Sequence, residues 1–136
     1  DGAVIEIQAQ DQRAIIAALR QWIRKRAHRL LPPLLAQVSR QTGLSYQGIS
    51  IRSQKTRWGS CSSSGNISLN DQLLFLPQDA VEYLMIHELC HTRQLNHSPA
   101  FWALVQTHCA DYRRHEERLS DSRSLVPDWF LLDLYN

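Results

Sequence analysis

The pentapeptide His87-Glu88-Leu89-Cys90-His91 has the pattern H-E-x-x-H. In a helix, residues four apart lie on one face, so the two imidazoles can bind one metal ion at roughly 2.0–2.1 Å. Glu88 lies about 100° around the same helix, where it can reach a water molecule on the metal without joining the ligand set. The segment therefore predicts a metal-binding helix in which Glu88 is the general base of a hydrolytic reaction.

The helix that carries this segment is apolar on nearly every side. Its apolar residues are Ala80, Val81, Leu84, Met85, Ile86, Leu89 and Cys90. A helix with this pattern is buried, and burying two His and a Glu without partners costs several kcal/mol. A metal ion would partner all three, although hydrogen-bonded core histidines and a salt-bridged Glu are the alternative. We expect the helix to run from about Gln78 to Leu95.

A third histidine, His97, follows six residues after the motif ends. Asn96 tolerates the left-handed conformation that ends a helix, and Ser98-Pro99 is a typical start for the next one. We therefore expect a sharp turn that brings His97 back to the metal as the third ligand, since catalytic zinc keeps three protein ligands and a water molecule. An acidic ligand from a later helix, Glu116 or Glu117, is the alternative.

The other histidines and the cysteines suggest structural roles. His108 lies in helical register with apolar neighbours, so we expect it in the core or supporting a ligand, whereas His115 lies in a charged stretch and is expected to be solvated. Cys90 is expected to be a small buried residue. The three cysteines, with Cys61 and Cys109, lack C-x-x-C spacing and form no disulfide framework. Reduced thiols in a small domain fit a cytoplasmic protein.

The elements around the metal helix can be traced outward from it. We expect Val4–Ile7 to end a strand. A helix should begin at Asp11, break or kink sharply at Pro32-Pro33, and continue as a second segment to about Gln41. Further along, we expect a strand over Tyr46–Arg52, a hairpin around Ser62–Asn66 with Ile67–Asn70 beyond it, helices from Ser98 to His108 and over Asp111–Leu119, and a docked apolar tail from Trp129 to Tyr135. This order predicts an α+β domain with a small antiparallel or mixed sheet packed on the metal helix.

Length and composition limit the remaining possibilities. The chain has 136 residues, 43% hydrophobic and 21% charged, which predicts one globular domain over residues 1–136. The net charge of +2 is too small to demand a nucleic-acid partner. No apolar run approaches the roughly 20 residues of a membrane span, and no signal peptide is visible, so we expect no membrane partner.

Several runs carry a resemblance to a known family. They are Arg57-Trp58-Gly59-Ser60-Cys61, Ile67-Ser68-Leu69-Asn70, Pro77, Tyr83–His91 and Asn96-His97-Ser98-Pro99-Ala100-Phe101-Trp102. Together they resemble the YgjP-like metallopeptidases over about residues 20–118, and more loosely the SprT-like proteases. The resemblance implies a zincin fold, one zinc ion bound by His87, His91 and His97, and Glu88 as base. Known members are commonly longer at the N-terminus, so we expect a minimal or trimmed member of the family.

Four further residues are candidates for contacts with substrate or with the ligands. Arg57 could bind a substrate carboxylate or phosphate, or instead stack on Trp58 or pair with an acidic residue. Asn70 is expected to hold a loop near the metal helix. Tyr112, His108 and Arg57 are the candidate donors to the oxyanion of a hydrolytic intermediate.

The sequence leaves several functions open. We favour a zinc peptidase whose extended substrate pairs with a sheet edge at Ile67–Asn70. A nucleoside triphosphate pyrophosphohydrolase would use Arg52, Lys55 and Arg57 against phosphate oxygens. A DNA-associated protease would use the basic cluster of the first helix, namely Arg24, Lys25, Arg26 and Arg29. A non-catalytic, zinc-stabilised binding module would not need Glu88. Nickel, cobalt, copper or manganese could replace zinc, because affinity alone does not select it.

Overall fold

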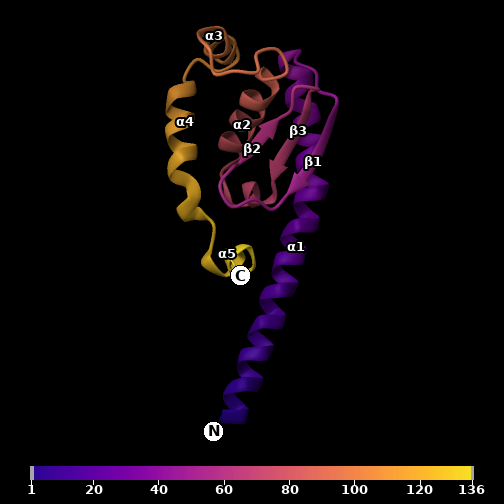
Figure 1. Ribbon diagram of the computed structural model, residues 1–136, viewed down its shortest axis with the longest axis vertical. Helices are drawn as coiled ribbons and strands as arrows, with labels where there is room; N and C mark the ends of the chain where they lie inside the picture. The colour runs from indigo at the N-terminus through magenta and orange to yellow at the C-terminus, as the bar shows by residue number, and fades with distance from the viewer. Residues whose placement is uncertain (1, 136) are drawn as a thin grey trace.

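The structure is a computed structural model that describes residues 2–135. The side chains are described for residues 2–131. It consists of a small sheet packed against helices (Figure 1). The elements are α1 (Gly2–Thr42), β1 (Gly48–Arg52), β2 (Gly59–Cys61), β3 (Asn66–Asn70), the 3-10 helix η1 (Asp71–Phe75), α2 (Gln78–Cys90), α3 (Pro99–His108), α4 (Tyr112–Asp121), the 3-10 helix η2 (Ser122–Leu125) and α5 (Asp128–Tyr135). The predicted α+β class is confirmed.

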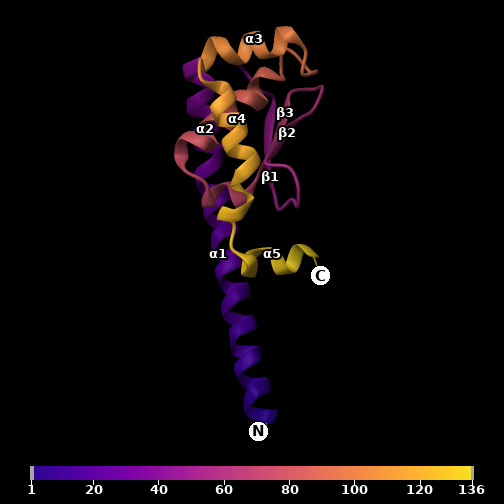
Figure 2. The ribbon, with the colours of Figure 1, turned by 90° about the vertical axis from the view of Figure 1, so that its left-hand side faces the viewer.

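Helix α1 is continuous, and its N-terminal part extends away from the rest of the chain (Figures 1 and 2). The predicted strand at Val4–Ile7 and the predicted break at Pro32-Pro33 are therefore wrong. The two prolines each remove one backbone hydrogen bond. The helix survives this loss because its second half buries a stripe at helical spacing, formed by Ala27, Leu31, Leu35 and Val38. It ends at Thr42, close to the predicted end at about Gln41, and the next residue, Gly43, has a φ of 73°.

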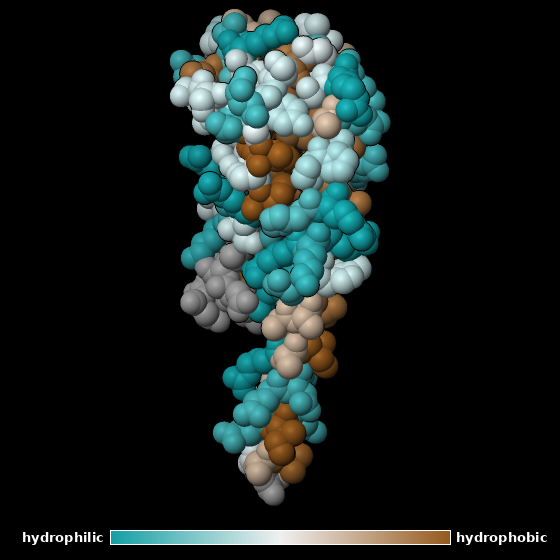
Figure 3. All heavy atoms as spheres, turned by 90° about the vertical axis from the view of Figure 1, so that its right-hand side faces the viewer, coloured by the Kyte–Doolittle hydropathy of each residue, from teal (hydrophilic) through white to brown (hydrophobic). Residues whose placement is uncertain are grey.

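The projecting part of α1 keeps large apolar side chains exposed. Figure 3 shows hydrophobic side chains along it and in the middle of the same face. The large apolar side chains that are exposed on this part of α1 are Val4, Ile5, Ile7, Ile15, Leu19 and Trp22. None of the helices within residues 2–135 is long and apolar enough to cross a membrane.

The sheet has the strand order β1-β3-β2, with β1 parallel and β2 antiparallel to β3. The predicted hairpin is confirmed, with Gly65 at a φ of 85° in its loop. However, β3 is the central strand, so the prediction that Ile67–Asn70 is a free edge is wrong. The reason is that β1, which precedes the hairpin, pairs with the second strand of the hairpin instead of the first. The edge strands are β1 and β2, and β2 is the one that packs beside α2.

Helices α2 to α5 complete the core. Tyr83, Met85 and Leu89 of α2 are almost fully buried, which confirms the prediction of a buried helix. The helix ends at Cys90, earlier than predicted. Helix α3 begins as predicted, with the Ser98 hydroxyl accepting the N–H of Phe101 at 3.3 Å. Phe130 of α5 is fully buried, which confirms docking of the tail at this residue, while the side chains beyond Leu131 lie outside the described part.

Candidate active site

Three imidazoles converge at the C-terminal end of α2. His87 lies in the last turn of α2, His91 is its C-cap and His97 lies in the connection to α3. The Nε2 atom of His97 lies 3.1 Å from Nε2 of His91 and 3.3 Å from Nε2 of His87. Ligand atoms of the three residues all lie within 4.8 Å of one another.

The geometry of these nitrogens fits one bound metal ion. Tetrahedral zinc with Zn–N bonds of 2.0–2.1 Å separates its nitrogen ligands by about 3.3–3.4 Å. The Nδ1 atom of His91 lies 2.9 Å from the carbonyl oxygen of Gln94, which only accepts, so Nδ1 carries the proton. In the neutral ring, the lone pair of Nε2 then faces the other imidazoles. A cation between the three nitrogens would remove the repulsion between converging lone pairs.

The histidine of the cluster that lies nearest the middle of α2 has a carboxylate behind it. Nδ1 of His87 lies 2.6 Å from Oε1 of Glu116, and the hydroxyl of Tyr83 donates to the same oxygen at 2.6 Å. Although burial opposes ionisation of Glu116, the hydrogen bonds from His87 and Tyr83 hold its pKa below the usual value. A carboxylate in this position fixes the tautomer and the ring orientation of a ligating histidine.

Aromatic rings hold the other two imidazoles. The ring of Phe101 stacks on His91 with centroids 4.3 Å apart, and the ring of Trp102 stacks on His97 at 5.7 Å. The segment between His91 and His97 turns differently from the sequence prediction. No non-glycine residue in the described chain has a positive φ. Asn96 is therefore not left-handed, and the chain turns through bonds such as Gln94 N to Cys90 O, at 3.0 Å.

Glu88 lies beside this cluster and is 5% exposed. Burial is the main cause that raises its pKa, to about 7; Glu116 adds to the rise, while His87 and Arg57 oppose it. A carboxyl group with a pKa near neutrality is well suited to accept a proton and release it again. Its neighbour on β2 is Gly59, where an added Cβ would lie 3.3 Å from Cγ of Glu88 and 3.1 Å from the carbonyl oxygen of Ser68. Glycine thus permits the close approach of β2 to α2.

Two adjoining hollows form a cleft between β2 and α2. One, of about 370 Å³, is lined by Ser60, Cys61, His91, Leu95 and His97 in addition to the shared residues. The other, of about 390 Å³, extends past Trp58, Glu116 and Leu119. The residues shared by the two hollows are Arg57, Gly59, His87 and Glu88.

The free edge of β2 borders this cleft. Asn70 N donates to Trp58 O and Ser62 N donates to Asn66 O, both at 2.9 Å. Because hydrogen-bonded and non-hydrogen-bonded pairs alternate in an antiparallel ladder, the N–H and C=O groups of Gly59 and Cys61 point away from β3. These groups are available to pair with an extended chain in the cleft.

The other candidates from the sequence divide into two groups. Arg57 is exposed and lines both hollows. Asn70 is fully buried and donates to the carbonyl oxygens of Gln54 and Arg57, at 3.0 and 2.8 Å, so it holds the loop that carries Arg57. Neither His108 nor Tyr112 lines the cleft. Tyr112 instead stacks on Trp102 at 5.3 Å.

Some functional contacts were not visible in the sequence. The sequence suggests Glu116 only as an alternative metal ligand, whereas its contact with Nδ1 of His87 joins residues 29 positions apart. Local spacing carries no signal for such a contact. The expectation that His115 is solvated is wrong: it is 7% exposed and stacks on Tyr83. The charged residues around it lie on the other faces of α4, so the local composition was misleading. Cys90 is fully buried, as predicted.

The fold and the cleft define a zincin-like metallopeptidase domain. The chain belongs to the YgjP-like metallopeptidase domain family, whose sequence model matches residues 2–122. It is therefore a hydrolase, and membership implies a divalent metal. The solved metallopeptidase zymogen of Pyrococcus abyssi, abylysin, is similar with 25% identity and a TM-score of 0.60, covering 70% of this chain and 96% of that one.

A second solved structure supports the fold alone. It is the metallopeptidase zymogen of Methanocaldococcus jannaschii, jannalysin, with 18% identity, a TM-score of 0.56, and coverage of 70% of this chain and 96% of that one. No curated protein matches the chain.

Proposed function

We propose that this chain is a zinc peptidase in which His87, His91 and His97 hold the metal and Glu88 is the general base. The observation that carries the proposal is the convergence of three Nε2 atoms beside a buried carboxylate and a free strand edge. A bound zinc ion would supply Lewis acidity, which acidifies a coordinated water molecule and polarises a carbonyl group. Nickel, cobalt, copper or manganese would fit the same nitrogen ligands.

The chain's own residues would carry out the remaining steps. An extended peptide pairs with the outward N–H and C=O groups of Gly59 and Cys61, which places its backbone across the histidine cluster. Glu88 takes a proton from the attacking water molecule and passes it to the leaving amine. Arg57, at the mouth of the cleft, is the candidate donor to developing negative charge, since His108 and Tyr112 lie outside it.

The test compares Glu88→Gln with the wild type on a mixed peptide library, read by mass spectrometry. The substitution keeps the shape of the side chain and removes the proton acceptor, so zinc content should be unchanged while turnover falls by about 10²–10⁴-fold. Glu117→Gln, at an exposed position on α4 outside the cleft, is the matched control and should retain activity. Equal cleavage by Glu88→Gln and the wild type would rule out this role for Glu88.

The position of Arg57 also favours a second candidate, hydrolysis of a phosphoanhydride such as a nucleoside triphosphate. A guanidinium at the mouth of the cleft suits phosphate oxygens as well as a carboxylate. Phosphate or pyrophosphate release that requires both Glu88 and Arg57, with no peptide cleaved, would establish this function in place of peptidase activity. Peptide fragments without phosphate release would instead support the peptidase, in which Arg57→Ala should lower turnover because a donor to the developing negative charge is lost.

A role on DNA has weaker support. Within the basic cluster of α1, the Nε atom of Arg24 lies 3.7 Å from Asp71 and the guanidinium of Arg26 lies 4.8 Å from the centroid of Trp22. These two side chains make contacts within the chain itself.

Three free cysteines support a reducing, cytoplasmic location.

A further inference from the structure

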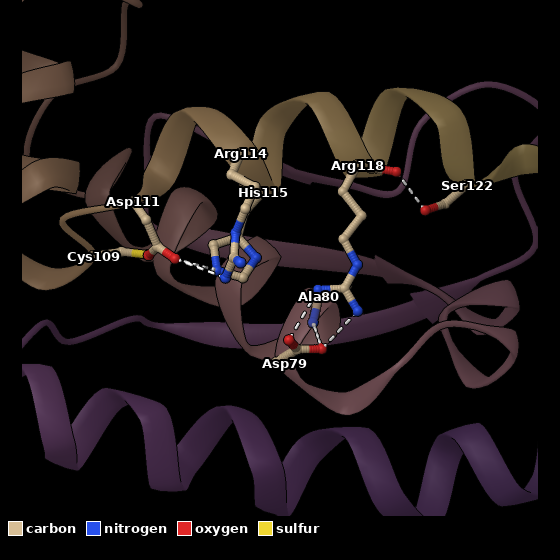
Figure 4. Close-up of polar contacts among 8 residues, drawn as sticks. All are labelled: Asp79, Ala80, Cys109, Asp111, Arg114, His115, Arg118 and Ser122. Atoms are coloured by element: carbon tan, nitrogen blue, oxygen red, sulfur yellow. Dashed lines mark hydrogen bonds and ion pairs between the residues drawn. The ribbon is translucent and has the colours of Figure 1, made fainter.

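A second group of metal-ligating side chains lies at the junction of α3 and α4 (Figure 4). Cys109 is the C-cap of α3, Asp111 is the N-cap of α4, and His115 lies one turn further on the same face. The thiol sulfur, a carboxylate oxygen and an imidazole nitrogen all lie within 4.8 Å of one another. None of the three residues lines the cleft.

The imidazole of His115 lacks the partners that a buried polar group normally has. It is 7% exposed, and its Nδ1 atom has no hydrogen-bond partner within the described part of the chain. Its Nε2 atom lies 3.6 Å from Oδ2 of Asp111, which is too long for a hydrogen bond. Stacking on Tyr83, with centroids 5.1 Å apart and planes 13° from parallel, holds the ring in place. Nε2 is the nitrogen that faces Asp111, so an ion beside that carboxylate would give the ring a partner on this side.

Both oxygens of Asp111 have partners that a bound ion would replace. The thiol of Cys109 donates to Oδ1 of Asp111 at 3.2 Å, and Nη2 of the exposed Arg114 donates to Oδ2 at 2.8 Å. Tetrahedral zinc separates sulfur, nitrogen and oxygen ligands by about 3.3–3.6 Å, so small side-chain rotations would bring the three groups to ligand distances. Burial and the charge of Asp111 raise the pKa of Cys109 to about 11. The same negative charge that opposes a free thiolate attracts a metal ion.

We propose that Cys109, Asp111 and His115 bind a second divalent transition-metal ion of the zinc class, with water completing its coordination. On binding, the S–H bond of Cys109 breaks, the proton leaves to solvent and a sulfur–metal bond forms. The ion ties the end of α3 to the first turn of α4. Helix α4 also carries Glu116, the partner of His87. An ion at the second site would therefore help to hold Glu116 in place against His87.

Cobalt(II) distinguishes the two sites in the full chain, because the histidine cluster contains no sulfur. The metal-free protein is titrated with cobalt while the thiolate-to-cobalt charge-transfer absorption is recorded. We expect about two cobalt ions per chain and a charge-transfer band. Cys109→Ser should lose the band and one ion, whereas His87→Ala should lose the other ion and keep the band. Cys61→Ser is the matched control, because Cys61 lines the cleft and its loss should leave the band intact.

Asp111→Asn provides a second variant at an exposed position. Loss of an outer partner alone weakens metal binding about 10–100-fold, so removing this charged ligand should weaken the sulfur-linked cobalt at least about tenfold. If circular dichroism shows that Cys109→Ser does not fold, the Asp111→Asn variant tests the second metal site in its place. Absence of the band in the wild type, its survival in Cys109→Ser, its loss in Cys61→Ser, or unchanged cobalt affinity in Asp111→Asn would each overturn the proposal.

Discussion

His97 is the exposed member of the histidine cluster and comes from a connection instead of a helix. If it is a metal ligand, His97→Ala should lose zinc from the cluster, as should His87→Ala and His91→Ala, because only two protein ligands would remain. Elemental analysis of the purified variants measures their zinc content. Each variant is made in a protein that also carries Cys109→Ser, so that any zinc at the α3–α4 junction is removed. Undiminished zinc in the His97 variant would move the third ligand to Glu116 or another group.

Glu116 makes a separate test of how the cluster is held. It contacts the far nitrogen of His87, so we assign it a positioning role and expect Glu116→Gln to weaken zinc binding about 10–100-fold. Competition with a chromophoric chelator measures the affinity. Glu117→Gln, its exposed neighbour, should leave the affinity unchanged. If the Glu116 variant instead loses zinc entirely while His97→Ala keeps it, Glu116 is a ligand.

Strand β2 is the element whose free edge, the proposed binding site for a peptide, lies beside Glu88. Gly59→Ala would place a Cβ 3.1 Å from the backbone oxygen of Ser68 and 3.3 Å from Cγ of Glu88, so strand and carboxylate must separate by a few tenths of an ångström. Since a displacement of about 1 Å can cost 10²-fold, we expect kcat to fall by about tenfold with zinc retained. Steady-state kinetics beside zinc analysis measures this. Full activity in Gly59→Ala would mean that β2 does not set the position of Glu88.

At the level of elements, local patterns predicted what local interactions decide. The apolar α2, the Ser98 cap and the hairpin at Gly65 depend on neighbours in sequence, and all three are present. The error at Pro32-Pro33 has a tertiary cause, because burial of Leu31 and Leu35 outweighs two lost backbone bonds. The position of β3 between β1 and β2 likewise depends on the pairing of β1 with β3, whose paired residues are 18 positions apart. The alternation of residues within one strand does not show which strand it pairs with.

In the whole molecule, the three histidines join the end of α2 to its connection with α3, and Glu116 adds α4 to the same centre. Metal binding should therefore stabilise the folded chain. At a free zinc concentration of about 100 times Kd, linkage contributes about 2.7 kcal/mol. For a domain of this size, we expect chelation to lower Tm by roughly 5–10 °C.

Scanning calorimetry with and without chelator measures this shift, and the variants divide it between the two proposed sites. His97→Ala should show a smaller loss of Tm on chelation than the wild type, because the histidine cluster no longer holds its ion. Cys109→Ser should remove only the part due to the α3–α4 junction. An unchanged Tm on chelation of zinc-loaded wild-type protein would mean that neither site binds its metal more tightly in the folded than in the unfolded chain, which contradicts a preformed cluster.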